Sequence, residues 1–565
     1  MACEPLLIGV TSHRDPAPDE VPALRARVAN FLGTLALANP TLAVTVVTSL
    51  AEGGDQLVAE EALALGLRVI AVLPMTLSSY VDDFTADEAR RRFETLLARA
   101  TVVEMPEVDG AAILGSDAGA KHVRAWHYTQ AGIYIASHSH LLLALWDGRP
   151  ARGSGGTADV VTYHLDGIEP ALIERRRNMA VLNRFGGSRE RFAFHIVCSR
   201  NGREGAPAPG LGPLQVFWRS GGGQAEDGDG PMPAELQRML DRLTAWQADL
   251  SRHCSGGNRA THTGTATPAS SPIERRFAAA DHLALLYRRR VIVAMRTLYS
   301  MAALMGIAFI GYEQLSQDSM IFVFLALFAA GVGIDRLAHK HAWHRKYLDY
   351  RALAEGLRVQ MYWRRGGLAT HDDAEFAHDD FLQKQDVELD WIRNVMRSAA
   401  LEAAAMPATP VDLDAVVDAW VGTPGGDGQL GFYQRRSRER AATHRLTERL
   451  GALSLWTGIA ICIFLAITIR VLPDDAKTAL VALMGSLSVI AAVREAYAYR
   501  KADKELIKQY RYMQRIFAQA RQAIDRAADD DAKRAILREL GEAALAEHAE
   551  WTLMHRERPL ERAHI

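Results

Sequence analysis

Four apolar runs in the second half of the chain constrain its fold more than any other feature of the sequence. They cover residues 297–312, 319–334, 452–472 and 478–493. A helix needs about 20 residues to cross the hydrocarbon core of a bilayer, with a usual range of ~17–25. The third run reaches this length alone, and the others reach it with flanking residues. Because each run is apolar around the whole helix, we expect four membrane-spanning helices rather than two buried hairpins of a soluble domain.

The charges around these runs predict how the helices are paired and oriented. Short acidic connectors join the runs in pairs, with Glu313 and Asp318 in the first and Asp474 and Asp475 in the second. The outer ends of both pairs are basic, as the positive-inside rule describes for cytoplasmic ends. We therefore expect a multi-pass protein of the inner (cytoplasmic) membrane, with both hairpin tips outside and the soluble segments and both termini in the cytoplasm. The basic flanking residues are Arg288, Arg289, Arg290, Arg336, Lys340, Arg435, Arg436, Arg438, Arg440, Arg494, Arg500 and Lys501.

The two hairpins look like copies of one unit, since a long amphipathic, aromatic-rich helix is expected after each of them. These helices are predicted at residues 344–363 and 499–524. Glycines such as Gly306 and Gly485 suit close helix packing in lipid. No run carries a central Asp, Glu or Lys, so a transporter with a proton relay is disfavoured. The pattern favours a homo-oligomer in the lipid bilayer that opens a pore or disturbs the membrane.

Short apolar strands alternate with helical stretches over the first 220 residues. Such strands, separated by helices, are typical of a doubly wound parallel sheet with a Rossmann-like α/β fold. Ligands bind to sheets of this kind at the carboxyl ends of the strands. A final edge strand is expected within residues 214–220. The expected strands of the alternating region are 6–12, 43–50, 68–75, 101–105, 140–148 and 193–200.

Three of these strands end in stretches with unusual chemistry. The first, "GVTSHRDP" (9–16), offers hydrogen-bond donors, and its Arg14 could hold a phosphate with two hydrogen bonds. The second, "TSLAEGGDQL" (48–57), has two adjacent glycines where a ligand, or another backbone, can come very close. The third, "WDGRPARGSGGTADVV" (146–161), places glycines just before Thr157, which can cap a helix whose N–H groups then face an anion.

All three stretches lie at the same edge of the predicted sheet, which favours one ligand site over three unrelated glycine-rich turns. Asp55 and Asp147 could hold ribose hydroxyls there, or they could simply cap helices and turns. His13 could donate to a phosphate or be an ordinary surface side chain. The candidate ligand-binding residues are Gly9, Thr11, His13, Arg14, Ser49, Glu52, Gly53, Gly54, Asp55, Asp147, Gly148, Gly155, Gly156 and Thr157.

The motifs "IGVTSHRDP", "VVTSLAEGGDQLVAEEAL" and "LLALWDGRPARGSGGTADVV", together with "VLPM" and "YVDDF", resemble the SLOG superfamily. This superfamily includes DprA-like proteins, lonely-guy (LOG) proteins and the N-terminal domain of melastatin-type TRP channels. The resemblance covers about the first 220 residues. The segment "DYRALAEGLRVQMYW" and the second hairpin with its trailing helix resemble SLATT domains, which are two-helix membrane effectors found beside nucleotide-sensing SLOG proteins.

The resemblance implies a sensor and effector of bacterial anti-phage defence. Its SLOG domain would bind a nucleotide second messenger, either a cyclic oligonucleotide or an ADP-ribose derivative, made by a functionally linked enzyme. The membrane part would then form a pore or depolarise the cell. The residues that the resemblance places in contact with phosphate are Gly9, Thr11, Arg14, Ser49, Gly53, Gly54, Gly156 and Thr157.

One departure from the LOG pattern argues against catalysis. LOG enzymes carry a PGGxGTxxE motif whose glutamate does acid–base work, and here "GSGGTADV" has Val160 at that position. Valine cannot move a proton, so we expect binding rather than hydrolysis. Asp159 or Glu52 could replace the glutamate, which leaves open a membrane-anchored hydrolase of nucleotides or NAD derivatives. A melastatin-like cation channel is the other alternative, with the acidic hairpin tips supplying a polar ring.

Length and composition bound these interpretations. The 565 residues exceed one hydrophobic core, and the net charge of −2 lacks the basic excess of a nucleic-acid-binding protein. The four cysteines show no spacing that suits zinc, so we expect no metal site and no resident cofactor. We predict domains at 1–220 (ligand sensing), 221–280 (linker with a helix), 281–370 (first hairpin unit), 371–430 (helical connector) and 431–565 (second hairpin unit).

Overall fold

The computed structural model divides the chain into two compact units. Unit 1 comprises Met1–Ala279, Leu353–Met361 and Ala369–Pro410, and unit 2 comprises Ala280–Ala352, Tyr362–Leu368 and Val411–Ile565. The residues that the structure describes are 3–84, 86–107, 120–151, 153–169, 172, 191–202, 205–254, 271–315, 317–368, 381–382, 389–406, 412–468, 470–500 and 503–556.

Unit 1 extends beyond the ligand-sensing domain predicted at residues 1–220. It takes in the segment up to residue 279, predicted as a linker, and part of the 371–430 segment, predicted as a separate connector. Residues 255–270 of this predicted linker lie outside the described residues. Unit 1 is larger than predicted because it includes α9 (Ala234–His253), the start of α10 (Pro272–Leu315) and α14 (Asp390–Ala404).

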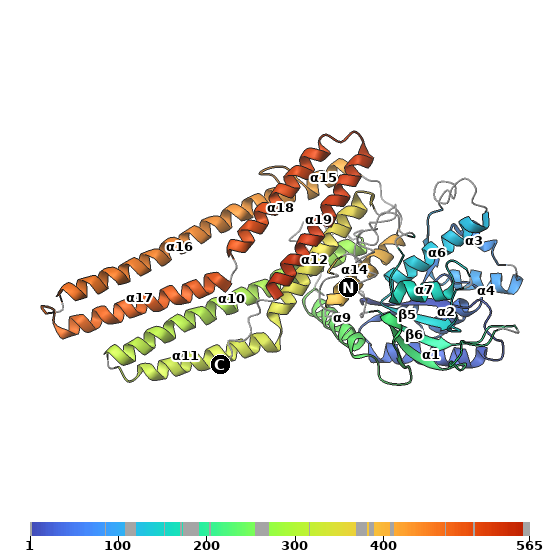
Figure 1. Ribbon diagram of the computed structural model, residues 1–565, viewed down its shortest axis with the longest axis horizontal. Coiled ribbons are helices and arrows are strands. Elements are labelled where there is room, and N and C mark those ends of the chain that lie inside the picture. The colour runs from blue at the N-terminus through green and yellow to red at the C-terminus, as the bar shows by residue number, and fades with distance from the viewer. Residues whose placement is uncertain are drawn as a thin grey trace. The chain divides into compact units, whose positions relative to one another are not determined.

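An eight-stranded sheet with the order β4-β3-β2-β1-β5-β6-β7-β8 forms the centre of unit 1 (Figure 1). Strands β1 to β6 pair in parallel, whereas β7 is antiparallel to β6 and β8 is antiparallel to β7. The predicted parallel sheet is therefore confirmed for six strands, and the expected edge strand, β7, is itself covered by β8. The strands are β1 (Pro5–Ser12), β2 (Ala43–Thr48), β3 (Arg68–Leu73), β4 (Thr101–Glu104), β5 (Leu141–Trp146), β6 (Phe192–Val197), β7 (Val216–Ser220) and β8 (Ala225–Asp227).

Helices cover both faces of this sheet, as in other doubly wound folds (Figure 1). On one face, α6 and α7 pack on β5 and β6 around Ala136, Ala144 and Val160. On the other face, Phe31 of α1 stacks on Phe194 of β6, with their ring centroids 4.2 Å apart. The helices of this layered part are α1 (Val21–Ala38), α2 (Gly54–Ala64), α3 (Leu77–Val81), α4 (Asp87–Leu97), α6 (Ala120–His138) and α7 (Thr157–Leu165).

Strand β1 occupies the position where the order of strands reverses. It pairs with β2 through Gly9 and Val47, and with β5 through Gly9 and Leu142. The chain adds β2, β3 and β4 on one side of β1 before β5 and β6 are added on the other side. In open sheets the ligand crevice lies at such a switch point, outside the carboxyl ends of the strands.

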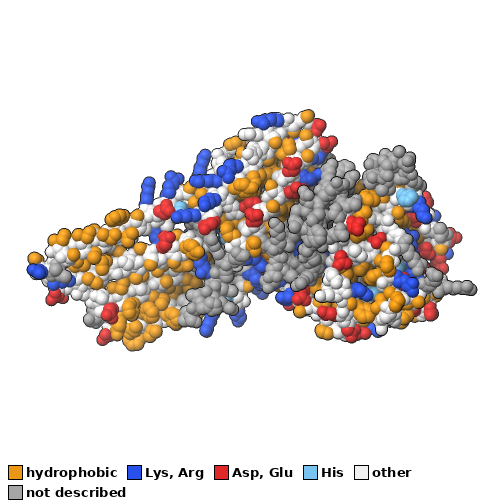
Figure 2. Space-filling view, in the orientation of Figure 1, with side chains coloured by type: hydrophobic (Ala, Val, Ile, Leu, Met, Phe, Trp, Pro, Cys, Tyr) orange, Lys and Arg blue, Asp and Glu red, His pale blue; other side chains and the backbone are white. Residues whose placement is uncertain are grey.

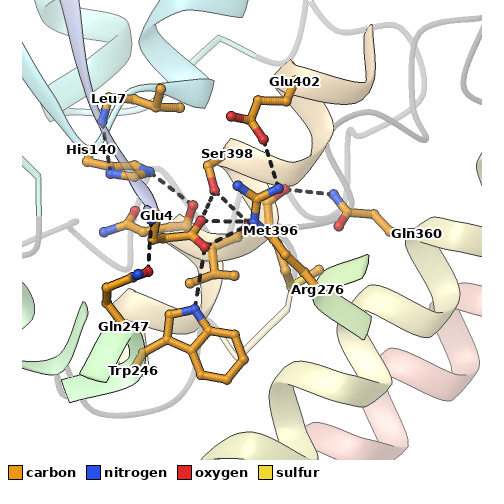
Figure 3. A network of polar contacts seen from close by, with 12 residues as sticks. Glu4, Leu7, His140, Trp246, Gln247, Arg276, Gln360, Met396, Ser398 and Glu402 are labelled. Atoms are coloured by element: carbon orange, nitrogen blue, oxygen red, sulfur yellow. Dashed lines mark hydrogen bonds and ion pairs between the residues drawn. The ribbon is translucent and has the colours of Figure 1, made fainter. Parts of the chain in front are cut away.

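A buried polar network holds α9, the start of α10 and α14 at the amino-terminal end of β1 (Figure 3). The Glu4 carboxylate accepts hydrogen bonds from Arg276 Nε of α10 at 3.0 Å and from Ser398 Oγ of α14 at 2.6 Å. The Glu4 N–H donates to Gln247 Oε1 of α9 at 2.9 Å. Arg276 also donates from Nη1 to Glu402 Oε2 at 2.9 Å, so its guanidinium lies between two carboxylates. Residues from three helices thus converge on one end of a central strand.

His140 extends the same network towards β5 (Figure 3). Its Nδ1 accepts a hydrogen bond from the Leu7 N–H at 3.2 Å, so the ring proton lies on Nε2, which donates to the Asn394 carbonyl oxygen at 2.9 Å. Both contacts need a neutral ring. Burial lowers the pKa of His140 to about 3, and the nearby positive charge of Arg397 acts in the same direction.

Unit 2 contains the two predicted hairpins, formed by α10 with α11 (Met320–Lys340) and by α16 (Gly428–Thr468) with α17 (Asp474–Arg500) (Figure 1). Among the described residues, four helices are long and apolar enough to cross a membrane. Their large apolar side chains are exposed, and Figure 2 shows hydrophobic side chains covering these helices. The remaining helices are α12 (Trp343–Arg365), α15 (Leu413–Trp420), α18 (Asp503–Ile524) and α19 (Asp530–Arg556).

The hairpins contact each other through α10 and α17, which run antiparallel. A Cβ added to Gly306 of α10 would lie 2.4 Å from Val489 Cγ1 of α17. One turn further along α10, Ile310 lies against Gly485, where an added Cβ would be 3.1 Å from Ile310 Cδ1. Glycine at both positions lets the two helices approach closely, as is typical of helix packing in lipid.

Candidate functional site

The loops that follow β1, β2 and β5 meet at the predicted edge of the sheet. Ser12 Oγ, at the end of β1, donates to Asp55 Oδ1 of α2 at 2.5 Å. Thr157 Oγ1, at the start of α7, donates to the Ser12 carbonyl oxygen at 2.9 Å. Ser12 therefore joins the three stretches that the sequence analysis placed together.

The two adjacent glycines make room for the protein's own backbone. Gly53 has a φ of +89°, and a Cβ added there would lie 2.2 Å from the Arg14 carbonyl oxygen. The Gly54 N–H donates to the His13 carbonyl oxygen at 3.1 Å, and an added Cβ would lie 2.5 Å from Ser12 Cβ. The sequence left open whether a ligand or another backbone approaches these glycines. In the structure it is the backbone of the loop after β1.

Asp55 is buried, and both of its carboxylate oxygens are engaged. Ser12 Oγ donates to Oδ1, and Thr48 Oγ1 donates to Oδ2 at 3.0 Å. Burial raises the pKa of Asp55 to about 6, although these hydroxyl groups partly oppose the shift. The sequence analysis suggested that Asp55 could hold ribose hydroxyls. In the structure its carboxylate instead links α2 to the ends of β1 and β2.

His13 and Asp147 form a second tie, between the ends of β1 and β5. His13 Nε2 lies 3.2 Å from Asp147 Oδ1 and accepts a hydrogen bond from the Asp147 N–H at 3.1 Å. Burial lowers the pKa of His13, and the opposing attraction of Asp147 does not cancel this effect. Asp147 Oδ1 also accepts a hydrogen bond from the Arg149 N–H at 2.9 Å, which stabilises the turn that follows β5.

The glycines before α7 are capped from within the same turn. Asp159 Oδ2 accepts hydrogen bonds from the N–H groups of Gly155 at 2.9 Å and Gly156 at 3.3 Å. These are the N–H groups that the sequence analysis expected to face an anion. Val160, at the position of the LOG glutamate, lies in the core between α7 and β5 with 5% of its surface exposed.

Other candidate residues pack within the fold. A Cβ added to Gly9 would lie 2.2 Å from Ser139 Oγ, and one added to Gly148 would lie 2.3 Å from Leu211 Cδ1. Thr11 is buried in β1. Ser49 and Glu52 are half-buried in the loop after β2, on the same edge as Arg14.

Arg14 differs from the other candidates because its side chain is exposed and forms no ion pair with any described residue. Its guanidinium carbon lies 4.9 Å from the centroid of the Tyr128 ring. Among the described residues, no carboxylate oxygen lies within 4.0 Å of its guanidinium nitrogens. The sequence predicted an anion-binding role for Arg14, and the structure leaves its cation facing solvent at the switch point.

The aromatic group beneath Arg14 was missed by the sequence analysis. Tyr128 lies on α6, and its hydroxyl donates to the Asp83 carboxylate, which pairs with Arg124 at 2.6 Å. Burial and the Asp83 contact raise the pKa of Tyr128 to about 12. Tyr80 donates its hydroxyl to the Ser49 carbonyl oxygen at 3.1 Å. No motif in the sequence indicated that residue 128 would reach the end of β1.

This arrangement offers a guanidinium that pairs with no carboxylate of the described residues, positioned by an aromatic ring, beside half-buried polar loops. It can hold an anionic group by charge-assisted hydrogen bonds. Among the described residues, no group of three or more His, Cys, Asp or Glu side chains could hold a metal ion.

No protein-family model and no curated protein matches this chain. The resemblance to SLOG and SLATT proteins, and the roles that it implies, therefore remain predictions.

Proposed function

We propose that this protein is a membrane effector that responds to a phosphorylated, nucleotide-derived ligand bound beside Arg14. The ligand class is a cyclic oligonucleotide or an ADP-ribose derivative. On binding, the helices of unit 2 form a pore or disturb the bilayer as a homo-oligomer. The setting that the SLOG and SLATT resemblance implies is bacterial antiviral defence, with a linked enzyme that makes the messenger and with both termini in the cytoplasm.

The observation that carries the proposal is that the Arg14 guanidinium is exposed and has no carboxylate partner among the described residues. An exposed guanidinium at the switch point of a doubly wound sheet is well suited to bind phosphate with two parallel hydrogen bonds. Stacking on Tyr128 limits the conformations of the side chain, so less entropy is lost on binding. Among the described residues, its charge has no carboxylate partner within 4.0 Å.

The geometry changes how recognition is expected to work. The N–H groups of Gly54, Gly155 and Gly156 already donate to His13 and Asp159, so they are not free for a phosphate. Recognition in this proposal therefore depends on the Arg14 side chain. The loop around Ser49 and Glu52, which is half-buried, follows β2 at the same edge of the sheet.

A thermal-shift screen of the full-length protein in detergent tests the binding step. The probes are ADP-ribose, NAD, cyclic di-AMP and cyclic tri-AMP. We expect at least one of them to raise the unfolding temperature, and Arg14→Gln to abolish the shift. The matched control is Arg91→Gln, which changes another exposed arginine on α4. A shift of equal size in Arg14→Gln and the control would show that the ligand binds elsewhere.

The same incubations separate binding from hydrolysis. The buried Val160 offers no acid–base group, and Asp159 is engaged in capping α7. We therefore expect the bound probe to be recovered intact by chromatography after hours at 37 °C. Steady release of a free base or of ribose phosphate would favour the membrane-anchored hydrolase instead.

A further inference from the structure

An exposed basic face lies on the polar parts of α16 and α18. Figure 2 shows lysine and arginine side chains gathered over these two helices. The spacing of three, four or seven residues places the members of each row on one side of their helix. The basic face consists of Arg438, Arg445 and Arg449 on α16 and of Lys508, Arg511 and Arg515 on α18, all of which are exposed.

The two rows lie side by side because α16 and α18 pack as an antiparallel pair. Tyr433 packs on Phe517, with ring centroids 5.6 Å apart, and Arg440 lies over the Tyr510 ring at 5.5 Å. Nearer the membrane span, Glu448 of α16 pairs with Lys504 at 3.5 Å. These contacts set α18 level with the stretch of α16 that directly precedes its apolar run.

The charges of the basic face are not neutralised within the part of the chain that the structure describes. None of its six side chains has a carboxylate oxygen within 4.0 Å there. The acidic side chains nearby pair elsewhere, since Glu439 binds Arg436 at 2.9 Å and Glu448 binds Lys504. The face therefore attracts an anionic partner.

The continuity of α16 indicates which partner. The helix runs without a break from the basic row into the apolar run that starts at Ala452. At a rise of ~1.5 Å per residue, Arg449 lies about 5 Å and Arg445 about 10 Å before that point, whereas Arg438 lies about 21 Å before it. Headgroups occupy roughly 5–8 Å beside the hydrocarbon core, so the first two arginines reach them or lie just above them.

We propose that the end of the basic face near the membrane binds anionic phospholipid headgroups of the leaflet that α16 enters. Attraction to an anionic leaflet decays within a Debye length of ~8 Å at physiological salt. Arg445 and Arg449 therefore contribute most, and the more distant Arg511 and Arg515 contribute little. A nucleic acid or an acidic protein would instead use the whole length of both rows.

Two variants with equal loss of charge test this proposal. The near variant is Arg445→Gln/Arg449→Gln, and the far variant is Arg511→Gln/Arg515→Gln. The full-length protein in an uncharged detergent is titrated with dioctanoyl phosphatidylglycerol or with dioctanoyl phosphatidylcholine, and the unfolding temperature is followed. We expect only phosphatidylglycerol to raise this temperature. We expect its apparent affinity to fall roughly tenfold in the near variant and less than twofold in the far variant.

Three results would overturn the proposal. Equal loss of affinity in both variants would mean that the whole face is used, and retention of a single-stranded oligonucleotide lost in the far variant would identify a nucleic acid as its occupant. Unchanged affinity in both variants would place the lipid elsewhere. An equal response of the wild-type protein to phosphatidylcholine would show that headgroup charge has no part in binding.

Discussion

At the scale of single residues, Arg14 and Tyr128 form the pair on which the proposed ligand recognition depends. The guanidinium lies over the ring, and the ring hydroxyl is held by Asp83. Tyr128→Leu removes the ring, and an exposed cation–π contact is worth about 0.5–1 kcal/mol. We predict a roughly threefold to fivefold loss of ligand affinity in Tyr128→Leu and a smaller loss in Tyr128→Phe, measured by titration of the responding probe. An equal loss in both variants would assign the effect to the hydroxyl.

Arg276 is the residue whose loss should most damage unit 1. Its guanidinium is buried between Glu4 and Glu402, and removing one partner of a buried ion pair typically costs about 3–5 kcal/mol. We predict that Arg276→Met lowers the free energy of unfolding of unit 1 by that amount. Denaturant titration can follow it through tryptophan fluorescence, because Trp246 Nε1 lies 3.4 Å from Glu4. Arg238→Met, which breaks an exposed pair with Glu235, is the control and should change stability little. Similar unfolding curves for Arg276→Met and Arg238→Met would show that the buried ion pairs of Arg276 do not stabilise unit 1.

Buried neutral histidines predict how stability depends on pH. Burial lowers the pKa of His140 to about 3 and that of His195 to about 4, below the ordinary value of 6.5. The unfolded chain therefore binds more protons, so the stabilisation is complete above pH 6.5 and is lost as the pH falls towards these values. His164, whose pKa burial also lowers to about 3, adds a third proton in the same direction. Asp55, with a pKa of about 6, acts in the opposite direction but contributes one proton against these three.

We predict that unit 1 loses stability between pH 7 and pH 5, with His140 alone accounting for about 2 kcal/mol. The measurement is denaturant unfolding of the full-length protein at both pH values. His140→Gln should show a shallower dependence, because glutamine does not titrate. A protein that is equally stable at both pH values would contradict the assignment of neutral rings.

At the scale of elements, close packing of α10 on α17 holds the two hairpins together. A Cβ at Gly306 would lie 2.4 Å from Val489, whereas nothing lies within 4 Å of a Cβ at Gly333 on α11. We predict that Gly306→Val lowers the unfolding temperature in detergent, by an overpacking cost of about 1–3 kcal/mol. Gly333→Val should leave this temperature unchanged. If both variants behave alike, α10 and α17 do not pack through Gly306.

Local patterns in the sequence were sufficient to predict most elements. The strands from β1 to β6 and the two apolar hairpins were predicted because their signals are runs of neighbouring residues. The docking of α9 and α14 on the sheet was not predicted, since it depends on contacts such as Glu4 with Ser398 that join distant parts of the chain. The helices α10 and α16 also begin well before their apolar runs, because amphipathic and membrane-spanning segments continue as one helix.

The sequence predicted where the candidate residues gather, but not how they contact one another. The motifs placed Gly53, Gly54 and Arg14 at one edge of the sheet because these residues follow recognisable strands, and the structure brings them together there. They did not predict that the glycines make room for the loop after β1, or that Asp159 caps Gly155 and Gly156. Those roles depend on which groups meet in space, and a glycine-rich stretch looks the same whether a ligand or the chain itself fills the room.

At the scale of the whole molecule, the proposed ligand site lies in unit 1, and the four helices that are long and apolar enough to cross a membrane contribute their apolar runs to unit 2. The boundary between the units at residue 279 falls inside α10, so one continuous helix carries both Arg276 and the first apolar run. A ligand can drive the membrane part only if it binds the active state more tightly than the resting state. The proposed function therefore requires coupling between the ligand site and the apolar helices.

Dye release from liposomes tests this coupling most directly. Full-length protein is reconstituted into vesicles loaded with a self-quenching dye, and ADP-ribose or cyclic tri-AMP is added on the side where unit 1 is accessible. The account predicts release from vesicles with wild-type protein only after one of these probes is added, and none with Arg14→Gln. Release that starts without any probe, or that is equally large with Arg14→Gln, would contradict it.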